Sequence, residues 1–211
     1  MEHIDLCRGR FTPSALPQCQ CFIEHGYARR DFSEKRLRHH ELSDIGIRHS
    51  LFVADIHTRL LLAARSGPTV IADWQEGSGL WDTSPAGDGI PAIPVRPDAY
   101  FILKHAERPE ERNKVHVFLE PGRSTMAHSR MATKIAGYLG YYEPGRHAKK
   151  YPSMQAFLVA TATQTRSRAR ELQKDLHPLI PHSAWRDAYL FIPFQELALN
   201  TLLPKAAASG A

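Results

Sequence analysis

Two acidic residues of this sequence stand in stretches that are otherwise apolar. Asp98 follows Pro97 inside the predicted strand 95–104, and Glu120 closes the predicted strand 114–120. Acidic side chains are rarely buried without a partner. If the two strands are adjacent, as their short connection favours, both carboxylates converge at one end of the sheet. Mg²⁺ is held by one or two carboxylates together with phosphate oxygens and water, so the pair predicts a minimal Mg²⁺ site for phosphodiester chemistry.

A lysine on the next predicted element belongs to the same neighbourhood. Lys134 lies in the predicted helix 127–142, on the flank of the apolar stripe around Ile135, together with Arg130. From there its amine could stabilise negative charge that develops at the end of the sheet. The alternative is structural: Asp98 is a strand-entry residue, and Glu120, before a proline and a glycine, is a turn acid bound to backbone donors.

Basic residues are clustered rather than spread. The sequence carries 27 Lys and Arg against 22 Asp and Glu, a formal charge of +5, and gathers cations at 29–40 and 146–150. Arg166, Arg168 and Arg170 crowd the start of a predicted helix, where the helix dipole disfavours cations. An external anion would offset that effect, so these three are candidates for phosphate contact. Each cluster is equally typical of a solvated face, but the three together favour a nucleic-acid partner.

The hydrophobic pattern predicts the elements that position these groups. A helix is predicted from residue 45 to about 66, with His49, Val53, Ile56, Leu60 and Ala63 on one stripe. Strands follow at 69–74, 95–104 and 114–120, then the helix 127–142, a strand at 156–162, a helix at 165–176 and a strand at 188–193. This order predicts an α/β fold with a mixed sheet flanked by helices. His49 is interpreted as either a core or capping histidine or a catalytic base.

Composition places the chain among ordinary globular proteins. No apolar run is long enough to span a membrane, and the N-terminus has no apolar stretch typical of a secretory signal. An odd number of cysteines, three, favours free thiols in a reducing compartment. We therefore expect a cytoplasmic protein without a membrane partner.

Three stretches of the sequence resemble the replication-relaxation family of plasmid-borne proteins. They are IRHSLFVADIHTRLLLAA, RPDAYFIL and VHVFLEPGRSTMAHSRMATKIAGYLGYY, and the resemblance extends over about residues 45–197. Its anchors are His49, Pro97 with Asp98, Glu120, Arg123 with Ser124 and Thr125, Lys134, Tyr138, and Arg168 or a neighbour. Members are associated with plasmid replication and DNA relaxation, which implies double-stranded plasmid DNA and replication or mobilisation proteins as partners.

The resemblance also implies an architecture. Such proteins usually carry a winged-helix domain ahead of a region similar in element order to the PD-(D/E)xK nuclease core. Here residues 1–44 are long enough only for a remnant of the winged helix, residues 45–197 form the α/β domain, and 198–211 are a tail. The chain departs from the nuclease pattern at Gly122, where nucleases of this fold carry a lysine.

Three functions remain open on this basis. The first is a DNA-associated protein of plasmid replication or relaxation, and the second is a Mg²⁺-dependent endonuclease or nickase. In the second, Asp98, Glu120 and Lys134 are catalytic, while Arg123, Arg130, Arg166, Arg168 and Arg170 contact the nucleic acid. The third is a degenerate interaction module without catalytic activity.

Overall fold

The computed structural model describes residues 44–84, 92–122, 127–142, 145–180 and 183–203. The chain divides into two compact units, residues 1–47 and 48–211, and only the last four residues of the first are among those described. Nearly all of the predicted N-terminal segment, the three cysteines and Arg123 lie outside the described residues. In the described part of the chain, no helix is both long and apolar enough to cross a membrane.

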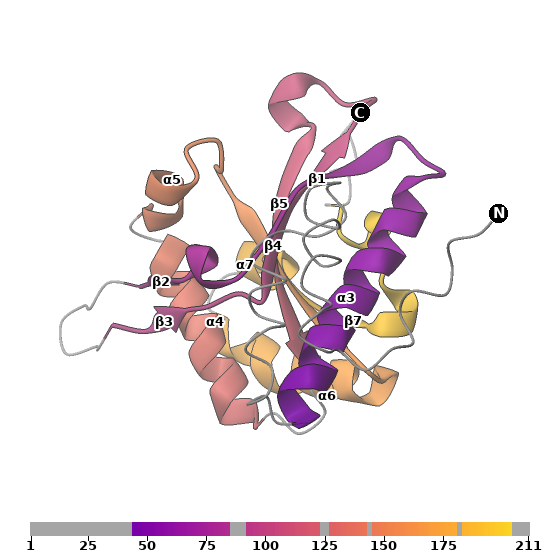
Figure 1. Cartoon of the computed structure of the whole chain (residues 1–211). Coiled ribbons are helices and arrows are strands. Elements are labelled where there is room, and N and C mark those ends of the chain that lie inside the picture. The colour runs from indigo at the N-terminus through magenta and orange to yellow at the C-terminus, as the bar shows by residue number, and fades with distance from the viewer. Residues whose placement is uncertain (1–43, 85–91, 123–126, 143–144, 181–182, 204–211) are drawn as a thin grey trace, which may run out of the picture. The chain divides into compact units, whose positions relative to one another are not determined.

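A five-stranded mixed sheet organises the second unit (Figure 1). Its strands are β1 (Thr69–Glu76), β4 (Ala99–His105), β5 (Lys114–Gly122), β6 (Phe157–Thr163) and β7 (Tyr189–Pro193), in that spatial order. The first three are antiparallel, whereas β6 runs parallel to β5 and β7 parallel to β6. The predicted mixed α/β fold is therefore confirmed.

The long helix α3 (Asp44–Ala64) covers one face of this sheet. Val53, Ile56 and Leu60 are buried in a cluster that includes Val117 and Leu119 of β5. Side chains alternate between the faces of a strand, so the odd-numbered residues of β5 meet this helix. The predicted stripe is correct at these three positions and wrong at Ala63, which is exposed because the stripe continues at Ala64, four residues after Leu60.

The helices α4 (His128–Tyr142) and α6 (Arg166–Leu176) cover the opposite face. Met131, Ile135 and Tyr138 of α4 pack in one cluster with Tyr100 of β4 and Phe118 of β5, an even-numbered residue. The last buried residue of the α4 stripe is Tyr141, whereas the predicted Tyr142 is only half-buried. Glu120 has the same parity as Phe118, so it points to the α4 face.

The predicted strand 95–104 is two strands in the structure. Residues Pro94–Val95 form β3, which pairs with β2 (Asp82–Thr83) in a small antiparallel hairpin, and β4 begins only at Ala99. Pro97 separates the two because it has no backbone N–H to continue a ladder. Asp98 consequently lies at a bend at the entrance of β4 rather than inside a strand, with its backbone N–H donating to the carbonyl of Leu119 at 3.0 Å.

Short elements complete the described structure. The helices are α5 (Arg146–Lys150) and α7 (Ser183–Ala188), and 3₁₀ turns occur at Ser78–Leu80, Glu110–Arg112, His177–Leu179, Phe194–Glu196 and Leu199–Thr201. Leu199 and Leu202 are buried with α3, so the core continues through residue 202. The remainder of the predicted tail, residues 204–211, lies outside the described residues.

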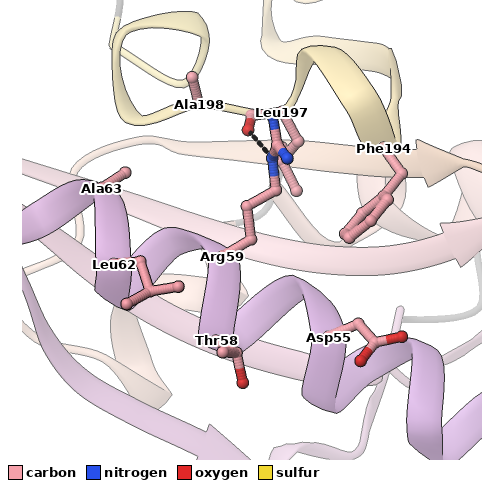
Figure 2. A pocket seen from close by; sticks show the side chains of 8 residues that line it. All are labelled: Asp55, Thr58, Arg59, Leu62, Ala63, Phe194, Leu197 and Ala198. Atoms are coloured by element: carbon pink, nitrogen blue, oxygen red, sulfur yellow. Dashed lines mark hydrogen bonds between the residues drawn. The ribbon is translucent and has the colours of Figure 1, made fainter.

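A surface cavity of about 560 Å³ lies between α3 and the C-terminal turns. Figure 2 shows Arg59 reaching across it towards Leu197. The Arg59 guanidinium donates to the carbonyls of Leu197 and Gln195, both at 2.7 Å, and lies over the ring of Phe194. These contacts satisfy carbonyls that the turns leave unpaired, so the arginine fastens the C-terminal segment to α3.

Candidate active site

The register of β4 and β5 brings the two predicted carboxylates together. Ala99 pairs with Leu119 in antiparallel register, and the backbone N–H of Asp98 donates to the Leu119 carbonyl at 3.0 Å, so Asp98 lies beside the end of β5, where Glu120 is located. The negative charge of Asp98 also raises the pKa of Glu120, an effect that two carboxylates have on each other only when they are close. Both acids therefore lie at the edge where β4 begins and β5 ends.

Glu120 is held from α4 by two donors. Lys134 Nζ donates to Glu120 Oε2, and Tyr138 Oη donates to Glu120 Oε1 at 2.7 Å. Lys134 and Tyr138 are four residues apart, so they project from the same side of the helix. The Glu120 side chain is only 2% exposed. Both carboxylate oxygens thus have a partner in a site almost closed to solvent.

Burial dominates the electrostatics of Glu120. Desolvation of the charged form and the nearby Asp98 charge raise its pKa to about 7, against the opposing effects of Lys134 and Tyr138. The carboxyl is therefore near its titration midpoint at neutral pH. Burial and the Glu120 charge in turn raise the pKa of Tyr138 well above its ordinary value. Tyr138 is for that reason a hydrogen-bond donor to the carboxylate and not a nucleophile.

His49 contacts the other carboxylate. Its Nε2 atom lies 2.7 Å from Asp98 Oδ1, and both side chains are about one-quarter exposed. His49 comes from α3, which packs on the face opposite α4, so Asp98 is reached from one helix and Glu120 from the other. From the sequence, two interpretations of His49 were open: a core or capping histidine, or a catalytic base. The structure places His49 as a partner of Asp98 at the edge of the sheet.

The predicted arginines take different positions. Arg130 and Arg170 are exposed on α4 and α6, whereas Arg166 pairs with Glu196, and Arg168 Nη1 lies 3.0 Å from Glu171 Oε2. Thr165 caps the N-terminus of α6, its hydroxyl accepting from the Arg168 backbone N–H. Internal carboxylates therefore offset part of the cationic crowding that the sequence suggested an external anion would relieve.

A second group of chemistry-bearing side chains joins α4 to α6. His128 Nε2 lies 3.0 Å from Glu171 Oε1, and His128 Nδ1 lies 2.9 Å from Asp175 Oδ2. These donor atoms all fall within 4.8 Å of one another, a spacing that could hold a metal ion. Arg168 Nη1 is also 2.6 Å from His128 Nε2, so a cationic side chain already occupies the cluster. These ion pairs and hydrogen bonds form a network that connects α4 to α6.

This network between His128, Glu171 and Asp175 was not predicted from the sequence. Glu171 and Asp175 are four residues apart, which places them on one face of α6, and that spacing was the available signal. Their partner, His128, begins a different helix, and only the packing of α4 against α6 brings the three together.

Comparison with known proteins supplies the family. The sequence model of the replication-relaxation family matches residues 20–156, more than half of the chain. The chain belongs to the replication-relaxation family. Its matched region includes Asp98, Glu120 and Lys134 and ends before β6. No curated protein and no solved structure matches the chain.

The donor chemistry of this replication-relaxation protein fits a hard divalent cation at Asp98 and Glu120. Burial is the main cause of the raised pKa of Glu120, and the negative charge of Asp98 adds to it; a cation between the two carboxylates would remove this repulsion. Both present oxygen ligands of the kind that Mg²⁺ prefers. Lys134 and Tyr138 already donate to the two oxygens of Glu120, so a cation would have to displace the Lys134 amine from one of them.

Proposed function

We propose that this protein acts on plasmid DNA during replication or relaxation and cuts one strand by Mg²⁺-dependent phosphodiester hydrolysis. The observation that carries the proposal is the proximity of Asp98 and Glu120 at the edge where β4 begins and β5 ends, with Lys134 bound to Glu120. A nick in one strand releases supercoiling, so hydrolysis at a single strand accounts for a relaxation function. Membership in the replication-relaxation family supports the choice of DNA as the substrate.

The order of elements supports a nuclease-like core. A helix, three antiparallel strands, a helix and a parallel strand follow one another as α3, β1, β4, β5, α4 and β6, with the short hairpin and α5 as insertions. Asp98 follows Pro97 at the start of the second strand of the main sheet, and Glu120 lies near the end of the third. This order is similar to that of the PD-(D/E)xK nuclease core.

The residues of the site have separate roles in the proposal. Asp98 and Glu120 would hold Mg²⁺, which supplies Lewis-acid polarisation of the phosphate and a more acidic water when bound. Lys134 lies within reach of the same point, so its amine can leave Glu120 and stabilise charge on a phosphate oxygen. This places on α4 the positive charge that Gly122 cannot provide from β5.

Two further residues position the carboxylates. His49 fixes Asp98 through the 2.7 Å contact, and Tyr138 fixes Glu120 through its hydroxyl. Because Tyr138 is buried with a strongly raised pKa, attack by a water molecule is favoured over a tyrosyl ester at this site.

The test is conversion of supercoiled plasmid to open circles. We expect nicking with Mg²⁺, none with EDTA, and a loss of roughly 100-fold or more in Asp98→Asn, because a bound cation supplies several kcal/mol and each 1.4 kcal/mol is tenfold. Lys134→Met should lose cleavage while retaining Mg²⁺ binding. Asp55→Asn, an exposed acid on the outer side of α3, is the matched control. Equal nicking by wild type and Asp98→Asn would refute the proposal.

A second candidate function is DNA binding without cleavage. Gly122 stands where nucleases of this fold carry a lysine, and Lys134 is engaged with Glu120 rather than directed at a substrate. This candidate predicts salt-dependent affinity for plasmid DNA and no nicking under any cation. An affinity that shows no dependence on salt would count against both candidates, because phosphate contacts release counterions.

A further inference from the structure

An exposed tryptophan lies among cations on the β2–β3 hairpin. Trp81 precedes β2 and is 51% exposed. Asp82 pairs with Val95 in the hairpin, so Trp81 stands opposite Arg96. The Arg96 guanidinium lies over the Trp81 ring, 4.9 Å from its centroid. The hairpin therefore presents a flat aromatic surface backed by a positive charge.

The neighbouring helix α5 adds three more cations. Lys150 Nζ donates to the carbonyl of Trp81 at 2.9 Å, and Arg146 Nη2 lies 3.5 Å from Asp82 Oδ1. Asp82, Arg146, Lys149 and Lys150 line a hollow of about 340 Å³. The surface formed by Trp81, Arg96, Arg146, Lys149 and Lys150, here called the Trp81 patch, thus sets four cations against the single carboxylate of Asp82 among its described residues.

One residue of the patch, Arg96, lies close to the proposed active site. Arg96 is two residues from Asp98, which is at most about 7 Å along an extended chain. The hairpin also packs on the side of α4 that carries Lys134. A Cβ added to Gly137, three residues after Lys134, would lie 3.1 Å from Ile93 Cγ2 and 3.5 Å from the Pro94 carbonyl. A nucleic-acid strand with a phosphate at Asp98 would therefore have its next nucleotides beside Arg96 and Trp81.

We propose that the Trp81 patch binds unpaired bases of single-stranded DNA next to the cleavage site, so that the preferred substrate is plasmid DNA with a locally opened strand. This inference rests on the proposed function for the choice of DNA. Bases inside a duplex are stacked on one another and cannot reach a protein ring, whereas an unpaired base stacks on an exposed aromatic side chain. The cations around the ring match the phosphates on either side of such a base.

The experiment compares single-stranded and duplex DNA in EDTA, where cleavage does not occur. Trp81→Ala should weaken binding of a dT15 oligonucleotide about tenfold, as expected for one lost stacking contact, and change binding of a 20-base-pair duplex less than twofold. Leu179→Ala, which removes a side chain of similar exposure (55%) outside the patch, is the matched control and should bind both as wild type does. Arg146→Ala with Lys149→Ala should reduce the salt dependence of dT15 binding by about two phosphate contacts.

Tryptophan fluorescence provides a second measurement in the intact protein. Trp74 is buried and Trp185 half-buried, so quenching by dT15 should come mainly from Trp81 and should disappear in Trp81→Phe. Equal loss of single-stranded and duplex binding in Trp81→Ala, unchanged dT15 affinity, or tighter binding of rU15 than of dT15 would overturn the inference. Because these assays need no cleavage, a protein that binds dT15 through Trp81 but does not nick plasmid would refute the proposed hydrolysis and leave the patch in place.

Discussion

The burial of Glu120 should make the stability of the protein fall as pH rises towards neutrality. The folded state raises the pKa of this carboxyl from 4.5 to about 7, mainly by desolvation. Between those values the folded protein keeps a proton that the unfolded chain releases. Stability contributed by Glu120 is therefore complete below pH 4.5 and lost as pH rises through 7. A shift of this size corresponds to about 3 kcal/mol in the free energy of unfolding, at 1.36 kcal/mol per unit.

The assay is urea denaturation of wild type and Glu120→Gln at several pH values from 4.5 to 8, in EDTA. The difference between the two removes the contribution of other groups, including His116, whose pKa is lowered by burial and whose effect has the opposite sign. We expect the wild type to lose about 3 kcal/mol relative to Glu120→Gln across this range.

Glu171 serves as a control, because its pKa is shifted in the opposite direction from that of Glu120. Glu171 is exposed, and its hydrogen bond with Arg168 holds its pKa below the usual range. Its contribution should be present above pH 4.5 and lost on acidification, so Glu171→Gln should leave the difference between pH 5 and 8 nearly unchanged. Parallel stability curves for wild type and Glu120→Gln would refute the description of Glu120 as a buried carboxyl with a raised pKa.

Two substitutions test contacts around the site and the core. Tyr138→Phe removes the hydroxyl that donates to Glu120, which should cost about 1–3 kcal/mol and raise the pKa of that carboxyl further, whereas Tyr142→Phe on the same helix should have little effect in denaturation experiments. Arg59→Met removes two hydrogen bonds to the C-terminal turns and should cost about 1–3 kcal/mol and speed proteolysis at the C-terminus. Thr58→Ala, at the rim of the same cavity, is its control, and equal stability of the two variants would contradict the anchoring role.

The main helices and strands follow from local pattern. The apolar residues Val53, Ile56 and Leu60 recur at helical spacing and are buried as that spacing predicts. The break at Pro97 was missed because Val95 continues the apolar pattern, and only its pairing with Asp82 shows that it belongs to a different sheet. A local sequence pattern indicates which side chains prefer burial, but it does not indicate which strand a residue pairs with.

Residue type identified the two acids, and tertiary structure supplied their partners. Asp98 and Glu120 stand out in sequence because carboxylates are costly among apolar residues. The histidine bound to Asp98 is 49 residues away along the chain, and the hydroxyl bound to Glu120 is 18 away. The exposure of about half of the Trp81 side chain beside Arg96 is likewise seen only in the structure.

The sequence alone thus determined the α/β composition, the family and the identity of the two acids, because these depend on residue type and short-range spacing. The packing of α3 and α4 on opposite faces decided the partners of each carboxylate and the burial that raises the pKa of Glu120, and the contact of the β2–β3 hairpin with α5 decided the cationic surface around Trp81. Solvent exclusion and charge proximity are properties of a packed arrangement, so they arise only when segments distant in the chain meet.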